Sequence, residues 1–87
     1  MTENKKVLDD HFMEGISGGT ETPQTFAFAV GDRVTLKYYD QIGIITEAYY
    51  YQFQTHFWNM YAVHWLKDNY NEEHDSRDVL EENLKRA

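Results

Sequence analysis

The chain has 87 residues, and its 15 acidic against 8 basic side chains give a formal charge of −7. A chain this short has room for one domain, and its acidity argues against general affinity for phosphate backbones or anionic lipid. Cysteine is absent, which excludes a disulfide framework and a thiolate zinc site, so apolar packing has to stabilise the fold.

Residues 1–25 are expected to form a flexible arm ahead of the domain. Leu8, Phe12 and Ile16 recur at four-residue spacing, which predicts a short amphipathic helix. Glycine, proline and polar residues at about 17–25 are typical of a linker. Because so short a helix is marginal in water, we expect it to lie either on its own domain or on a partner protein.

From Phe26 onward the hydrophobic period is two, which is typical of strands. The pattern predicts a turn at Val30–Asp32, a first strand at Val34–Tyr38, a loop at 39–41 and a long second strand at Ile42–Tyr51. Strict alternation along the second strand places Ile42, Ile44, Ala48 and Tyr50 on one face and Ile45, Glu47, Tyr49 and Tyr51 on the other.

The rest of the chain predicts a hairpin loop, two more strands, a helical turn and a closing strand. The loop is expected at Gln52–Asn59, the third strand at Met60–Trp65, the fourth at Tyr70–Asp75, the helical turn at Arg77–Glu82 and the closing strand around Leu84. In the third strand, Tyr61, Val63 and Trp65 are expected to point inward. The predicted core consists of Val34, Ile44, Val63, Trp65 and Leu84.

Four short motifs carry a resemblance to known small barrels. They are Val30-Gly31-Asp32-Arg33-Val34, Gly43-Ile44-Ile45, Tyr61-Ala62-Val63-His64-Trp65 and Glu81-Glu82-Asn83-Leu84. Together they resemble Src homology 3-like barrels, with Tudor and KOW modules similar in outline, and in particular short uncharacterised bacteriophage-encoded barrel proteins. The resemblance implies a mainly β fold, a five-stranded Src homology 3-like small antiparallel barrel over residues 26–87.

The predicted hairpin holds more aromatic area than a domain of this size easily buries. We therefore expect a partner-binding surface made of Tyr49, Tyr51, Phe53, Phe57 and Trp58, with Leu8, Phe12 and Ile16 of the arm. The alternative is that this loop folds back over the open end of the barrel.

Tyr38, Tyr39, Trp65 and Tyr70 are expected near two neighbouring loops. The resemblance to Tudor modules implies an aromatic cage for methylated cations there. The alternative, which we favour, is that Trp65 belongs to the core and the tyrosines cover the barrel with their hydroxyls in water.

The histidines and acidic residues fit structural roles better than catalytic ones. His56, His64 and His74, with Glu73 and Asp75, match no compact metal motif, so we expect no metal, no cofactor and no enzymatic activity. An acidic face is expected from Glu72, Glu73, Asp75, Asp78, Glu81 and Glu82. It either keeps the protein solvated or attracts a basic, nucleic-acid-binding protein.

The sequence therefore predicts a noncatalytic protein–protein interaction module, phage-encoded, that docks on a larger assembly such as the virion. One alternative is an acidic regulator that binds a host enzyme or the transcription machinery. Another is KOW-type nucleic-acid binding. Residues 26–87 contain ten acids and six bases, and this balance of −4 disfavours it.

The expected location is the virion or the cytoplasm of the infected bacterium. The sequence has no apolar run near the roughly 18 residues of a membrane span and no signal-type segment. The oligomeric state stays open.

Overall fold

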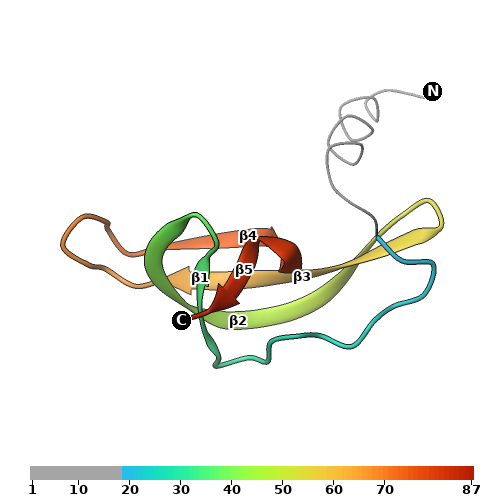
Figure 1. Cartoon of the computed structure of the whole chain (residues 1–87), viewed down its shortest axis with the longest axis horizontal. Helices are drawn as coiled ribbons and strands as arrows, with labels where there is room; N and C mark the ends of the chain where they lie inside the picture. Colours follow the sequence, from blue (N-terminus) through green and yellow to red (C-terminus); the bar gives the residue numbers. More distant parts are fainter. Residues whose placement is uncertain (1–18) are drawn as a thin grey trace, which may run out of the picture.

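The computed structural model describes residues 19–87, which form one five-stranded antiparallel sheet (Figure 1). The strands are β1 (Arg33–Leu36), β2 (Tyr39–Phe53), β3 (His56–Trp65), β4 (His74–Leu80) and β5 (Leu84–Arg86), with the 3-10 turn η1 (Glu81–Asn83) before β5. The described part contains no α-helix, and so none that is long and apolar enough to cross a membrane. The predicted mainly β class is thus confirmed, whereas the predicted N-terminal helix lies outside the described residues.

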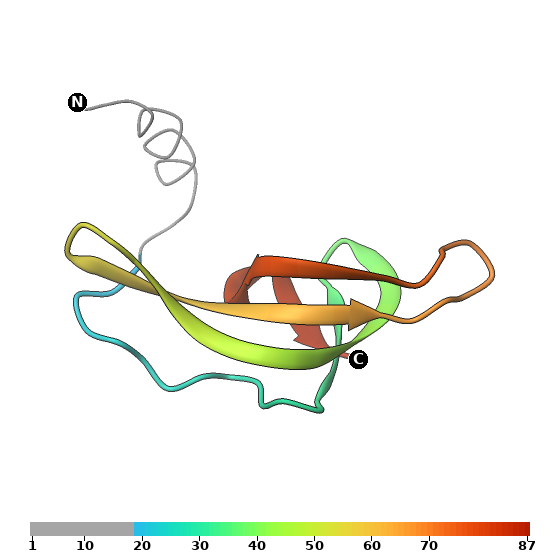
Figure 2. The same ribbon diagram turned by 180° about the vertical axis from the view of Figure 1, so that it is seen from behind.

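The sheet is open, so the prediction of a closed barrel is wrong. Its strand order is β4-β3-β2-β1-β5, and β4 and β5 form its two edges without pairing to each other. Closure would need β4 to pair with β5, but η1 follows the buried Leu80 directly and the buried Leu84 enters β5, which pairs with β1. Seen from both sides, a long β2–β3 hairpin extends beyond the shorter strands (Figures 1 and 2).

This hairpin is longer than the sequence pattern indicates. Residues 39–41 and most of 52–59, both predicted as loops, belong to β2 and β3, which are joined by Gln54 and Thr55 alone. Gln54 adopts a positive φ of 55°, as the first residue of a tight hairpin turn does. Since the sequence has no Asn-Gly or Asp-Gly pair here, the turn carries no recognisable signal.

A β-bulge in β2 changes which residues point inward. Ile45 pairs with Val63, but the next partner pair is Glu47 with Ala62, so Thr46 is the extra residue. Before the bulge the odd-numbered residues face the core, and after it the even-numbered ones do. The predicted core position of Ile44 is therefore wrong, because Ile45 is fully buried and Ile44 only half-buried.

The core consists of Phe28, Val34, Ile45, Tyr61, Val63, Trp65 and Leu84. The four other predicted core residues, Val34, Val63, Trp65 and Leu84, are thus confirmed. Gly43 lies directly beneath two of them, because a Cβ built there would stand 2.5 Å from Val63 Cγ1 and 2.6 Å from Trp65 Cε3. Only glycine allows so close an approach of β2 to these side chains.

The fourth strand lies later in the chain than predicted. Tyr70 belongs to the β3–β4 loop, and β4 occupies His74–Leu80, so the first four residues of the predicted helical turn at 77–82 are part of the strand. Arg77 and Asp78 together oppose Ala62 as a second bulge, and Asp78 has a positive φ of 59°. This irregularity interrupts the alternation of β4 and hides the strand from pattern analysis.

The segment before β1 crosses the sheet and is tied to it by one carboxylate. Glu81 Oε2 accepts hydrogen bonds from the Ala27 amide at 2.7 Å, from Asn59 Nδ2 at 3.1 Å and from the Tyr61 hydroxyl at 2.5 Å. Within the predicted arm, the Thr20 and Phe57 backbones exchange two hydrogen bonds. Glu81, predicted on the acidic face, thus holds the segment on the core.

Candidate functional site

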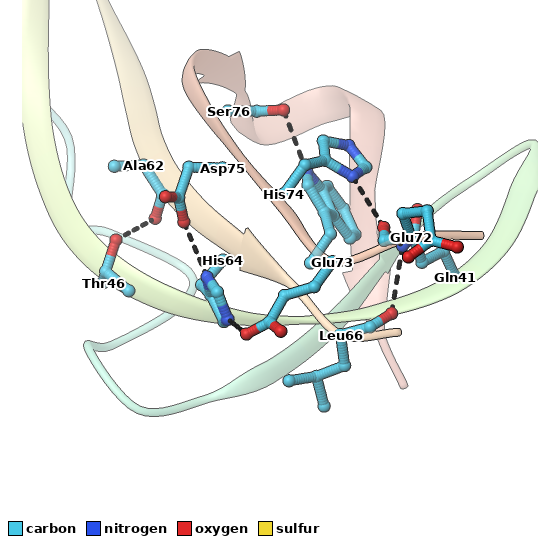
Figure 3. A network of polar contacts seen from close by, with 11 residues as sticks. Gln41, Thr46, Ala62, His64, Leu66, Glu72, Glu73, His74, Asp75 and Ser76 are labelled. Atoms are coloured by element: carbon cyan, nitrogen blue, oxygen red, sulfur yellow. Dashed lines mark hydrogen bonds and ion pairs between the residues drawn. The ribbon is translucent and has the colours of Figure 1, made fainter. Parts of the chain in front are cut away.

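The β3–β4 loop is held in place by a buried glutamine. Gln41 is 2% exposed, and its Nε2 donates to the Leu66 carbonyl and to the Glu72 carbonyl, both at 3.0 Å (Figure 3). One amide group therefore fixes both ends of the loop, which limits the positions that its tip can take.

Within the loop, Asp68 organises the tip. Its Oδ1 accepts from the Tyr70 amide at 2.8 Å and from the Asn71 amide at 2.7 Å. These hydrogen bonds, with that from the Asn71 side chain, lower the pKa of the Asp68 carboxyl, which is therefore negatively charged at neutral pH. The same bonds fix the backbone of the loop at Tyr70, whose side chain is exposed.

The loop tip and the β1–β2 turn together form what we call the tyrosine end. It comprises Tyr38, Tyr39, Asp40, Asp68, Tyr70 and Asn71, which line a shallow depression of about 300 Å³. Tyr38 is 91% exposed and Tyr70 92%, while the Tyr39 hydroxyl bonds Asn71 Oδ1 across the two loops. Tyrosine rings beside carboxylates can hold a cationic or hydrogen-bonding group of a partner.

The predicted cluster of Tyr38, Tyr39, Trp65 and Tyr70 is only partly brought together. The three tyrosines share the depression, but Trp65 is buried in the core, as the favoured alternative has it. Trp65 instead lines a neighbouring hollow of about 280 Å³, which shares Tyr39 and Asn71 with the first. Its Nε1 donates to Ser76 Oγ at 3.0 Å, and His74 stacks beside its ring.

His64 is clamped between two carboxylates on the outer face of the sheet (Figure 3). Its Nδ1 lies 2.6 Å from Asp75 Oδ1 and its Nε2 lies 2.6 Å from Glu73 Oε2. Both hydrogen bonds raise the pKa of the His64 imidazole, that to Asp75 first, since only the protonated ring donates from both nitrogens.

The candidate metal ligands do not form one site. Each nitrogen of His64 faces a different carboxylate, His74 stacks on Trp65, and His56 lies in the hairpin at the other end of β3. Within residues 19–87, no three His, Cys, Asp or Glu side chains are grouped to hold an ion.

The aromatic residues of the hairpin divide between its two faces. On the core side, Tyr50 stacks on Phe26 at 4.8 Å between ring centroids and meets Phe57 edge-on at 6.5 Å. On the opposite side, the Tyr51 and Trp58 rings lie 6.3 Å apart. On the two faces together, half-buried positions are held by Tyr51, Phe53, Phe57 and Trp58.

Two predicted binding residues make specific contacts within the protein. Tyr49 crosses over β3, where its hydroxyl donates to Asp78 Oδ1 and accepts from the Asp78 amide at 2.7 Å. Desolvation and the bond to Asp78 raise the pKa of the Tyr49 hydroxyl. Trp58 packs against Gly19, where a Cβ would stand 2.5 Å from the indole ring, and its buried Nε1 has no hydrogen-bond partner among residues 19–87.

The six predicted acidic-face residues are spread along β4 and its two flanks. Glu73 and Asp75 bind His64, Asp78 binds Tyr49, and Glu81 holds the 26–29 segment. Glu72 lies 3.9 Å from Lys67 Nζ, and Glu82 lines a hollow of about 140 Å³ beside Trp58. The predicted binding residues Leu8, Phe12 and Ile16 lie outside the described part of the chain.

Sequence reasoning missed the side chains that shape this site. Gln41 stood in a predicted loop, and the opposition of His64 and Asp75 depends on the β3–β4 register. The complementary charges of His64, Glu73 and Asp75 could have indicated their contact, but only after β3 and β4 had been aligned in the correct register.

Searches with protein-family models, curated protein sequences and solved structures find no match to this chain.

Proposed function

We propose that the protein is a noncatalytic protein–protein interaction module and that the tyrosine end is the surface that binds its partner. The observation that carries the proposal is the exposure of Tyr38 and Tyr70, at 91% and 92%, beside one depression. Tyrosine offers a large, rigid contact area with a hydrogen-bonding tip, and it is enriched in binding surfaces for that reason.

The charge of the tyrosine end favours a particular kind of partner. Asp40 is exposed, and the lowered pKa of Asp68 keeps that carboxylate charged at neutral pH. Ring faces and carboxylates both attract cations. A protein segment that carries lysine or arginine together with hydrogen-bonding groups therefore fits this surface best.

The finer description of the fold belongs to the same proposal. The strand order β4-β3-β2-β1-β5, with a 3-10 turn before the last strand, supports a Src homology 3-like arrangement whose barrel stays open. The motif resemblance further supports a phage-encoded accessory protein that docks on an assembly such as the virion. The acidic-regulator alternative has less support, because Glu73, Asp75 and Glu81 are engaged within the protein.

Affinity capture with matched variants tests the proposal. Bait proteins are the natural chain, the double variant Tyr38→Ala/Tyr70→Ala and the control Val30→Ala, which removes an apolar side chain that is 65% exposed elsewhere. Each is incubated with purified phage particles and with lysate of infected cells, and captured proteins are identified by mass spectrometry. We expect a protein that the natural chain and Val30→Ala retain and that the double variant loses. An identical set of captured proteins for all three baits would contradict the proposal.

A further inference from the structure

Among residues 19–87, no strand lies next to the outer side of β2 over its distal half. β1 pairs with β2 only as far as Ile44, and the Ile45 backbone bonds to Gly31 at 2.8 Å and to Asp32 at 3.0 Å. Beyond that point, β3 is the only backbone partner of Glu47–Phe53 within residues 19–87. As far as the described residues go, this stretch, which we call the open β2 edge, is therefore a free strand edge.

The direction of its backbone groups follows from the pairing of β3. Phe57 exchanges both of its backbone hydrogen bonds with Thr20 on the far side of β3. Gln52 of β2 stands opposite Phe57, so these two residues form a pair without mutual backbone hydrogen bonds. Hydrogen-bonded and non-hydrogen-bonded pairs alternate along an antiparallel ladder. The N–H and C=O groups of Gln52, Tyr50 and Ala48 consequently all point out of the open β2 edge.

The other two sheet edges are protected against pairing, and this one is not. β4 carries the bulge at Asp78 and two acids, and β5 has only three residues, of which two are cationic. Bulges, charges and short length are the usual means of blocking edge-to-edge association. The stretch Ala48–Phe53 reads AYYYQF and has no charge, no proline and no glycine. A protein this small would expose such an edge at the risk of aggregation unless a specific partner covers it.

We propose that the open β2 edge pairs antiparallel with the same edge of a second copy of this chain, across a two-fold axis at Tyr50. Tyr50 then faces Tyr50 of the second copy, and Ala48 faces Gln52. The three outward-pointing residues of each copy would exchange about six backbone hydrogen bonds.

The side chains are compatible with this register. Tyr49 stands opposite Tyr51 of the second copy in this register, and no like charges meet at this pair, although the Tyr49 hydroxyl stays bonded to Asp78 across β3. Glu47, the only charged residue of the edge, faces Phe53 and not another carboxylate. A self-complementary edge of this kind favours a second copy over an unrelated strand. The hairpin lies at the opposite end of the molecule from the β3–β4 loop, so both tyrosine ends remain accessible (Figure 1).

Sedimentation or light scattering of the full chain over a range of concentrations tests the proposal. We expect a concentration-dependent dimer that added salt strengthens, since each copy carries a charge of −7 and salt screens the repulsion. Tyr50→Lys places two cations against each other on the axis and should abolish the dimer. Tyr38→Lys makes the same charge change at an exposed site elsewhere and should retain it. A chain that is monomeric throughout, or a dimer that survives Tyr50→Lys, would overturn the proposal.

Cross-linking gives a second, independent measurement. The natural chain has no cysteine, so Tyr50→Cys and Tyr38→Cys each introduce a single thiol. Directly opposed residues in a hydrogen-bonded antiparallel pair have Cα atoms about 5.5 Å apart, within the range of a disulfide. Under mild copper–phenanthroline oxidation, Tyr50→Cys should form covalent dimers much faster than Tyr38→Cys. Equal rates for the two variants would mean that the edge does not self-associate.

Discussion

The two halves of the β2–β3 hairpin have very different surroundings. The half near the β3–β4 loop lies between β1 and β4, and Gln41 and His64 fix its loop. In the described part of the chain, the distal half has no strand on the β2 side and only the Thr20 bridge on the β3 side. A two-stranded ribbon alone is marginally stable. Folding stability therefore resides mainly in the first half, and the second half retains unpaired backbone for association.

The largest change in stability is expected from one of two adjacent isoleucines of β2. Ile45 is fully buried in the core, whereas Ile44 is half-buried on the opposite face. Ile45→Ala should lower the free energy of unfolding by about 2–5 kcal/mol, as cavity-forming core substitutions do. Ile44→Ala, the matched control, should cost less than about 1 kcal/mol because little buried volume is lost. Denaturant titration measures both, and equal losses would mean that the bulge at Thr46 is wrongly placed.

That pair also marks how far the sequence can predict this fold. Period-two alternation identified Val34, Val63 and Trp65 as core residues, because regular strands keep one phase. Bulges at Thr46 and at Arg77–Asp78 shift the phase, and no residue type at these positions signals the shift.

The candidate site shows the same limit. The tyrosines of the two loops could be placed near each other from the expected strand order alone. The hydrogen bonds that hold the loops could not be predicted, because the bonds of Gln41 and His64 depend on the register of strands far apart in the chain.

The next largest effect is expected at the carboxylate that ties the crossing segment to the core. Glu81→Ala would leave the Ala27 amide, the Asn59 amide and the buried Tyr61 hydroxyl without their shared acceptor. We expect a loss of about 1–3 kcal/mol in the free energy of unfolding. Glu21→Ala removes a carboxylate from an exposed position and serves as the control. If both variants unfold at the same denaturant concentration, Glu81 is a solvated surface acid after all.

A smaller effect, visible only as a change with pH, is expected from His64. Its folded pKa is raised above the ordinary value of about 6.5. Its stabilising contribution is therefore complete below the unfolded pKa and is lost as the pH rises through the folded pKa. The melting temperature of the natural chain should approach that of His64→Gln as the pH increases, because the neutral ring can donate to only one of its two carboxylates.

An NMR titration of the His64 ring measures the folded pKa directly. A midpoint at or below the ordinary histidine value would show that Glu73 and Asp75 do not clamp the protonated ring in solution.

The smallest effect on stability should come from the residues proposed to bind the partner. Tyr38→Ser and Tyr70→Ser remove rings that are almost fully exposed, so each should change the free energy of unfolding by less than about 0.5 kcal/mol. Tyr39→Phe is the informative contrast, because it removes the hydroxyl that bonds Asn71 and joins the two loops. It should cost about 0.5–1.5 kcal/mol, the usual contribution of one such bond. If Tyr38→Ser or Tyr70→Ser were as costly as Tyr39→Phe, these rings would serve the fold, and their exposure would no longer argue for binding.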